Sequence, residues 1–291
     1  LIFSCSSIDS VTPSTSTTTA TTLNPLWIPP ILTGSTFNLS LEKATKQFQA
    51  GAKTNTYGYN GNDFWGPTLI MKKGDNVTLN VTNKIDETTT VHWHGFHIPA
   101  EMDGGPHQTV AAGTTWSPTF KVMNNAATYW YHPHFMGKTA AQAIKGAAGL
   151  IIVRDPVEAA LVLPRRYGID DFPLIIQCQQ YDSLNQAMPL GMQDSTLLVN
   201  GARANCGYTV NANLPAQVVR LRLLNASGER TFNFGFSGNK SFKIITSDGG
   251  LLNSPVNATR IRLSPGERTE ILVDLNGMNG QILYLMGYAS E

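Results

Sequence analysis

The chain has 291 residues, which predicts about two domains, and 42% of them are hydrophobic. Its formal net charge is +1 and only 14% of its residues are charged. This balance argues against a nucleic-acid-binding protein, which would show a clustered basic excess, and against a polybasic membrane-surface protein. No run reaches the roughly 18 apolar residues of a transmembrane helix, and the many glycines, prolines and Thr/Val runs favour an all-β protein.

The first residues resemble an export signal followed by a spacer. The chain opens with LIFSC, which resembles the end of a bacterial lipoprotein signal, where the cysteine becomes lipidated. Residues 6–22 are mostly Ser and Thr and cannot bury enough surface to offset the entropy of ordering them. We therefore predict a signal remnant and flexible tether over residues 1–24, with a lipid anchor at Cys5. The alternative is an ordinary disordered N-terminus with an incidental cysteine.

Strand-like patterns then recur through a first block. Apolar and polar residues alternate along residues 37–41 and 77–81, the period of half-buried strands. We predict a β-domain over residues 25–155 and a linker over residues 156–170. Further strands are predicted at residues 115–122, 127–131 and 149–153. The notable helical candidate is an Ala- and Gln-rich segment, residues 137–145, which ends at a glycine.

A second block, residues 171–291, repeats the strand pattern. Residues 219–225 read VRLRLLN, with the same spacing of apolar residues and a final asparagine as VTLNVTN at 77–83. This match fits two copies of one β-sandwich. Further strands are predicted at residues 195–199, 242–246 and 269–273.

All six histidines lie within 43 positions, and four of them form two His-x-His pairs. Residues i and i+2 of a strand point to the same face, so His92 and His94 aim at one place, and so do His132 and His134. Neutral imidazole suits copper, zinc, iron or nickel, and the lack of nearby cysteines and the few carboxylates disfavour calcium, magnesium and thiolate-rich zinc sites. The competing interpretation is a zinc or structural site. The two remaining histidines stand alone and are expected in loops: His97 and His107.

The residues around these pairs extend into longer motifs. The first block contains TVHWHG (90–95), MDGGP (102–106), YWYHPH (129–134) and GAAGLIIV (146–153), and the second contains RLRLLNAS (220–227), SDGG (247–250) and SPGER (264–268). Together they resemble the first and middle domains of multicopper oxidases, above all bacterial periplasmic copper-efflux oxidases and their laccase-like relatives. This resemblance covers roughly residues 25–291 and implies two consecutive cupredoxin-like Greek-key β-sandwich domains.

The resemblance also implies copper as the cofactor. His92 matches a ligand of the type 2 copper, and His94, His132 and His134 match ligands of the type 3 copper pair. Asp103 matches an acidic residue that helps deliver protons to reduced oxygen, so it is the predicted catalytic residue; the alternative is a turn aspartate before Gly-Gly. Two neighbouring aromatic residues are expected to pack around the site: Trp93 and Trp130.

Other parts of the family's copper machinery have no counterpart in this sequence. The family's trinuclear cluster takes four further histidines from its last domain, and its type 1 copper takes a His-Cys-His motif, but no histidine follows His134. We therefore expect a missing C-terminal cupredoxin domain to be the partner that carries them. Neither Cys178 nor Cys206 adjoins a histidine; they are expected as a disulfide or as two buried thiols.

The predicted function is that of the N-terminal portion of a multicopper oxidase, inactive alone. The whole enzyme would couple one-electron oxidation of Cu(I) or of phenolic and other aromatic reductants to reduction of dioxygen to water, in the periplasm or at the cell surface. The alternatives are a non-catalytic cupredoxin-scaffold interaction protein and a copper-binding protein. A nitrite reductase-like enzyme is disfavoured because its first domain would need a cysteine, and residues 23–155 contain none.

Overall fold

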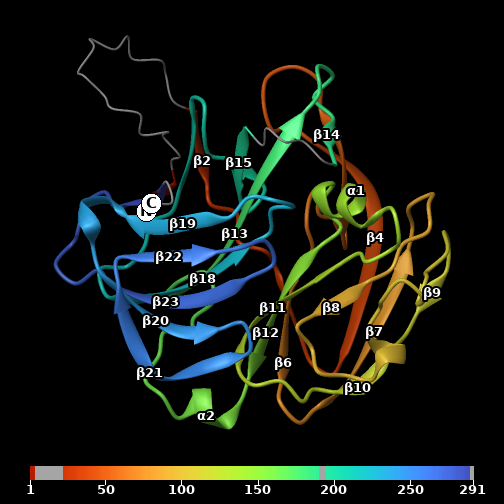
Figure 1. The fold of residues 1–291 in the computed structure, drawn as a ribbon, viewed down its shortest axis with the longest axis horizontal. Coiled ribbons are helices and arrows are strands. Elements are labelled where there is room, and N and C mark those ends of the chain that lie inside the picture. The colour runs from red at the N-terminus through yellow and green to blue at the C-terminus, as the bar shows by residue number, and fades with distance from the viewer. Residues whose placement is uncertain (4–21, 190–194, 289–291) are drawn as a thin grey trace.

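The computed structural model describes residues 1–3, 22–189 and 195–288. In these residues the strands form four sheets, which build two sandwiches lying side by side (Figure 1). Cys5 and most of the predicted tether lie outside the described residues. Within the described ranges, no helix combines the length and hydropathy needed to cross a membrane.

The first sandwich is built from two sheets. The first sheet joins β10 (Thr119–Lys121), β7 (Asn76–Asn83), β4 (Thr36–Lys46) and β5 (Thr54–Tyr59), with β9 (Thr115–Trp116) also paired to β7. The second sheet joins β3 (Ile31–Thr33), β6 (Thr68–Lys72), β12 (Gly149–Arg154), β11 (Ala127–His132) and β8 (His92–His94). The helices of this half are η1 (Ala100–Met102), α1 (Thr139–Ile144) and α2 (Pro156–Ala159).

The alternating residues of the first block face its core, as the sequence pattern predicts. Val77, Leu79 and Val81 of β7 are fully buried, while the residues between them are partly exposed. The helix predicted at residues 137–145 is confirmed as α1. The single strand predicted at residues 115–122 is wrong, because the chain forms β9 and β10 on either side of Pro118, whose nitrogen has no hydrogen to donate to a strand ladder.

The second sandwich also consists of two sheets. One joins β2 (Thr22–Pro25), β17 (Tyr208–Asn211), β1 (Ile2–Phe3), β24 (Tyr284–Tyr288), β19 (Phe232–Phe236) and β22 (Arg260–Leu263). The other joins β16 (Ala202–Arg203), β15 (Thr196–Val199), β13 (Asp171–Tyr181), β18 (Val218–Asn225), β23 (Arg268–Asp274), β20 (Phe242–Ser247) and β21 (Gly250–Ala258), with β14 (Ala187–Met188) paired to β13 and η2 (Ser237–Asn239) following β19.

Two short strands of this sandwich come from the segment predicted to be a tether. The strand β1 pairs with β17 and β24, and β2 pairs with β17. The two ends of the segment predicted to be a flexible tether are therefore strands, because their backbone groups pair with strands of the second sandwich.

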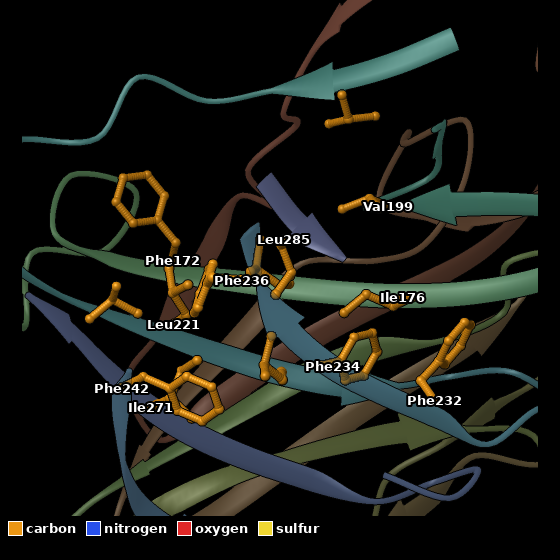
Figure 2. Packing of buried hydrophobic residues seen from close by; sticks show 14 of the residues in the cluster. Phe172, Ile176, Val199, Leu221, Phe232, Phe234, Phe236, Phe242, Ile271 and Leu285 are labelled. Carbon is orange, nitrogen blue, oxygen red and sulfur yellow. The ribbon is translucent and has the colours of Figure 1, made fainter. Parts of the chain in front are cut away.

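Aromatic side chains fill the second core from both sheets. Figure 2 shows Phe234 and Phe236 of β19 among Phe172, Leu221 and neighbouring aliphatic residues. These residues alternate along their strands, so each sheet contributes one apolar face.

The two blocks share a structural repeat around a buried asparagine. Asn83 ends β7 and Asn225 ends β18, and both side chains are fully buried. In each, Oδ1 accepts from the backbone N–H two residues later, at Ile85 and Ser227. Each Nδ2 donates to two backbone carbonyls, one of them far away in sequence. The strand pairing agrees, since β7 lies parallel to β4 as β18 does to β13. The repeated sequence pattern therefore reflects two copies of one strand arrangement.

Replacing Asn225 by alanine is expected to lower the free energy of unfolding by about 1–3 kcal/mol or more, because several buried backbone groups lose their hydrogen-bond partners. Chemical denaturation checks this value. Asn76→Ala, at the exposed start of β7, is the control and is expected to change stability little. Equal effects of the two substitutions would contradict a special role of the buried asparagine.

Strand β11 connects the two sandwiches because its side chains alternate between them. Tyr129 and Tyr131 point into the core of the first sandwich. Trp130, on the other face of the strand, packs in an apolar cluster with residues of the second sandwich. The members of this interface cluster are Phe48, Phe64, Trp65, Trp130, Ala148, Leu150, Ile175, Leu198 and Leu224. Since Thr128 and His132 share the face of Trp130, they also lie toward the interface.

Candidate metal centre

The two His-x-His segments lie on neighbouring antiparallel strands, β8 and β11. Their register places His132 opposite His92 and Trp130 opposite His94. The intervening Trp93 points into the first core and is fully buried, so the two histidines of β8 share the opposite face. The alternation predicted from the sequence therefore brings imidazoles from both strands to one place.

Three of these imidazoles converge closely. His92, His94 and His132 each offer a ring nitrogen within 4.8 Å of the other two. The shortest separation joins Nδ1 of His94 to Nε2 of His132, at 3.1 Å. Trp130 supports both of these rings, with its ring centroid 4.1 Å from that of His132 and 5.1 Å from that of His94.

His134 lies just after β11, at the rim of this group. Its ring centroid is 5.3 Å from that of His92 and 6.2 Å from that of His132. Its backbone N–H donates to Thr90 Oγ1 at 2.6 Å, which fixes the chain as it leaves the strand. His134 is exposed whereas His132 is buried, so the histidine group opens toward the surface on one side.

Asp103 contacts the first histidine of the group. Nδ1 of His92 lies 2.9 Å from the backbone oxygen of Asp103 and 3.3 Å from its carboxylate Oδ2. Because Nδ1 donates to these oxygens, Nε2 of His92 remains available as a ligand. The carboxylate is about one-third exposed, so it lies between the imidazole and solvent.

The other predicted residues lie outside the group. His97 and His107 are exposed in loops, as expected for histidines without a partner in the sequence. Cys178 is buried in β13, and Cys206 lies exposed in the turn before β17. The structure therefore places neither cysteine among the clustered histidines. It also joins them by no disulfide, and only Cys178 of the two is a buried thiol.

Burial keeps two of the imidazoles neutral. Desolvation, followed by the charge of Arg268, lowers the pKa of His94 to about 4. Desolvation also lowers the pKa of His132 to about 3, although a hydrogen bond to the carbonyl of Pro133 acts in the opposite direction. Both rings therefore keep a nitrogen lone pair at neutral pH, which metal binding requires.

The copper-free protein is expected to lose stability as the pH falls from about 6.5 toward 4. In that range the unfolded chain binds protons at His94 and His132 while the folded protein does not, so acid favours unfolding. The loss amounts to at most about 1.4 kcal/mol per pH unit for each histidine. Melting temperatures measured between pH 7 and 4.5 check this, and the double substitution of both residues by glutamine should flatten the profile. Replacing the exposed His107 by glutamine should leave the profile unchanged, and a flat wild-type profile would contradict the expectation.

The second sandwich also borders this site, which the sequence motifs did not predict. The turn between β22 and β23 approaches His94 at Gly266, where a Cβ atom would lie 3.2 Å from the ring carbon Cε1. Arg268 follows that turn and is buried beside Gly95, the residue after His94. The motif SPGER marks this turn in the sequence, but nothing in its spacing indicates that it approaches the histidines.

The residues present fit a bound metal ion. Nitrogen ligands lie about 2.0–2.1 Å from ions of this kind, so the 3.1 Å separation of the His94 and His132 nitrogens suits two ligands of one ion. The donor set is neutral imidazole, with the carboxylate of Asp103 beside it, which suits copper, zinc, iron or nickel better than calcium or magnesium.

Comparisons with known proteins identify the kind of metal protein. A family profile described as "Multicopper oxidase" matches residues 40–158, and a second with the same description matches residues 176–289. The curated "Multicopper oxidase mco" of Staphylococcus haemolyticus is 40% identical over 257 residues, which is 86% of this chain and 55% of that protein. "Cell division protein FtsP" of Escherichia coli is 35% identical over 260 residues, or 87% of this chain and 54% of that protein.

A solved structure extends the likeness to three dimensions. CueO from Ochrobactrum sp., described as a laccase-like multi-copper oxidase with activity towards lignin model compounds and lignosulfonate, has a TM-score of 0.80 and 34% sequence identity. The superposition covers 91% of this chain and 64% of that one. This chain thus spans about half to two-thirds of the length of such relatives.

Two cupredoxin-like β-sandwiches, the first carrying paired imidazole ligands, define a copper protein of the cupredoxin class. The chain belongs to the multicopper oxidase family, as the two matched profiles show. The predicted fold class is thereby confirmed.

Proposed function

We propose that this chain supplies four histidine ligands to a trinuclear copper centre of an oxidase that reduces dioxygen to water. The observation that carries the proposal is the convergence of His92, His94 and His132, whose ring nitrogens lie within 4.8 Å of one another. Copper bound there would supply one-electron redox chemistry, so that electrons from a reducing substrate can be passed to dioxygen.

The positions of the imidazoles support separate assignments. His94 and His132 would hold one copper of the type 3 pair together, because their nitrogens lie 3.1 Å apart. His134, at the exposed rim, would bind the other type 3 copper, and His92 the type 2 copper. Hydrogen bonds from Nδ1 to the oxygens of Asp103 set the tautomer of His92, and burial keeps His94 and His132 deprotonated.

Asp103 is suited to move protons at this centre. Its carboxylate lies 3.3 Å from His92 and is partly exposed, so it can exchange a proton with solvent and hold it beside the ligands. Reduction of dioxygen to water consumes protons, and Asp103 would deliver them. The alternative role is a turn aspartate that only fixes His92 through its backbone oxygen.

A partner is required to complete such a centre. The four histidines lie on one side of the site, and the site is open to the surface at the exposed His134. We propose that a further cupredoxin domain supplies four more imidazoles on that side, together with the type 1 copper that accepts electrons. The reductant would be Cu(I) or a phenolic or other aromatic compound. The parent protein would be exported to the periplasm or cell surface, with a lipid anchor at Cys5, which lies outside the described residues.

A second candidate function is favoured by one finding. The chain is 35% identical to "Cell division protein FtsP", a value close to its 40% identity with the staphylococcal oxidase. A non-catalytic interaction protein on the same scaffold is therefore the alternative to an oxidase. It would have no need for converging imidazoles, which favours the oxidase.

Copper content and oxygen consumption of the full-length protein test the proposal. We expect several copper ions per chain and oxygen uptake when Cu(I) or a phenol is added. Copper binding without oxygen uptake would support a copper-binding protein instead. A protein that neither retains copper nor consumes oxygen would contradict the proposal and favour the interaction protein.

A further inference from the structure

The turn between β22 and β23 reaches across from the second sandwich to the histidine group. Its backbone is anchored to the end of β18, where Gly266 N–H donates to the Asn225 carbonyl at 2.8 Å and Asn225 N–H donates to the Glu267 carbonyl at 3.1 Å. Within the turn, Glu267 N–H donates to the Ser264 carbonyl at 3.1 Å. The turn is therefore fixed to the sheet of the second sandwich that faces the interface.

Gly266 brings the backbone of this turn against the ring of His94. A Cβ atom there would lie 3.2 Å from His94 Cε1, 3.7 Å from His94 Nε2 and 3.9 Å from Trp130 Cζ2. Its φ of +82° is also a conformation that favours glycine. Nδ1 of His94 faces His132, whereas the turn borders the Cε1–Nε2 edge of the ring. Nδ1 therefore still points toward the other histidines.

Arg268 ties this turn to the strand that carries His132. Its guanidinium donates to the Gly266 carbonyl at 3.0 Å, to the Thr128 carbonyl of β11 at 3.1 Å and to the Asp248 carbonyl at 3.0 Å. The side chain is only 4% exposed. At Gly95, directly after His94, a Cβ atom would lie 2.7 Å from Nη2 of Arg268, so the guanidinium also fills the space beneath β8.

We infer that the turn at residues 264–267 positions the copper ligand His94, and that Arg268 is the positioning residue that holds the turn against β8 and β11. This inference rests on the proposed function. Among the described residues, the second sandwich contributes no ligand of its own to the histidine group, yet its turn limits the rotation of a ligand ring. Groups that orient a ligating histidine typically change metal affinity by about 10–100-fold when they are altered.

Two glycine variants of the full-length protein test the contact. In Gly266→Ala the new methyl group meets His94, whereas in Gly207→Ala, at nearly the same φ of +85°, no atom of the described residues lies within 4 Å of the new Cβ. The backbone strain is matched, so the two variants should lose similar melting temperature. Copper affinity, measured by titrating Cu(II) against a chelator, is expected to fall about 10–100-fold in Gly266→Ala alone. The electron paramagnetic resonance spectrum of the bound Cu(II) should change in that variant and not in the control.

A second pair of variants addresses the case in which Gly266→Ala does not fold. Arg268→Lys keeps the charge but cannot span the three carbonyls, and it is expected to lower copper affinity and alter the same spectrum. Arg260→Lys, at an arginine that stacks on Tyr288 at the start of β22, is the control and should leave copper affinity and the spectrum unchanged.

The outcomes separate this inference from the proposed function. If the wild-type protein binds copper and both Arg268→Lys and any folded Gly266→Ala keep its copper affinity and spectrum, only the positioning role is overturned. Wild-type protein that binds no copper would overturn the proposed function and this inference with it.

Discussion

Replacing both His94 and His132 by glutamine is expected to lower the affinity for copper by more than about 100-fold. These two residues offer the closest pair of ring nitrogens, 3.1 Å apart, and burial keeps both neutral at pH 7. Glutamine is similar in size but supplies no imidazole lone pair, so the site loses ligands with little change in packing. Copper retained after dialysis and oxygen uptake by the full-length protein are the measurements.

The matched control for this prediction is the substitution of the two loop histidines, His97 and His107, by glutamine. Both are exposed and lie outside the histidine group, so copper content should stay at the wild-type level. If the His94 and His132 variant retained its copper, the metal would have to bind elsewhere, and the assignment of the centre to β8 and β11 would be wrong.

Replacing Glu270 by glutamine is expected to lower the free energy of unfolding by about 3–5 kcal/mol. Glu270 on β23 is fully buried and accepts hydrogen bonds from Arg220 and Arg222, both also buried. Although burial alone would raise its pKa, Arg222 and Arg220 hold the pKa of Glu270 below its ordinary value. Removing its charge leaves two buried guanidinium groups with too few carboxylates.

This ion network also joins the two sandwiches. Thr128 of β11 donates to Glu270 at 2.7 Å and accepts from Arg222 at 3.0 Å. The network continues to Asp171, which Arg222 contacts with two hydrogen bonds, and to Glu158 of α2, which lies 2.7 Å from Arg220. The interface is therefore held by charge as well as by the apolar cluster around Trp130.

Urea denaturation of Glu270→Gln measures this contribution. Asp274→Asn, at the exposed end of the same strand, is the control and should change stability little. A comparable loss in both variants would show that strand β23 is sensitive to any change of charge and that the buried network has no special role.

The likeness to both oxidases and a cell division protein shows why the scaffold alone does not decide function. Both kinds of relative cover over 80% of this chain, so the sandwiches are shared. For this chain, a test of copper binding at its converging imidazoles separates the two proposed functions. The copper measurements above therefore carry more weight for function than further fold comparison.

The sequence by itself determined the strands and the ligand pairs. Period-2 alternation predicted β7 and β18, and the repeated asparagine predicted two copies of one arrangement, because both signals are local and follow from the geometry of a strand. The spacing of His92 and His94 placed two imidazoles on one face for the same reason. Local patterns failed where a single residue interrupted the ladder, as at Pro118, and where the ends of the predicted tether joined ladders of the second sandwich.

Only the tertiary structure decided how the second sandwich meets the site. The contacts of Gly266 with His94 and of Arg268 with Thr128 join residues more than 130 positions apart. No pattern in the sequence indicates that the charges of Arg222 and Glu270 are buried together. Their burial follows from the position of β11, whose side chains alternate between the first core and the interface with the second sandwich. Such contacts depend on which faces pack together and not on any local periodicity.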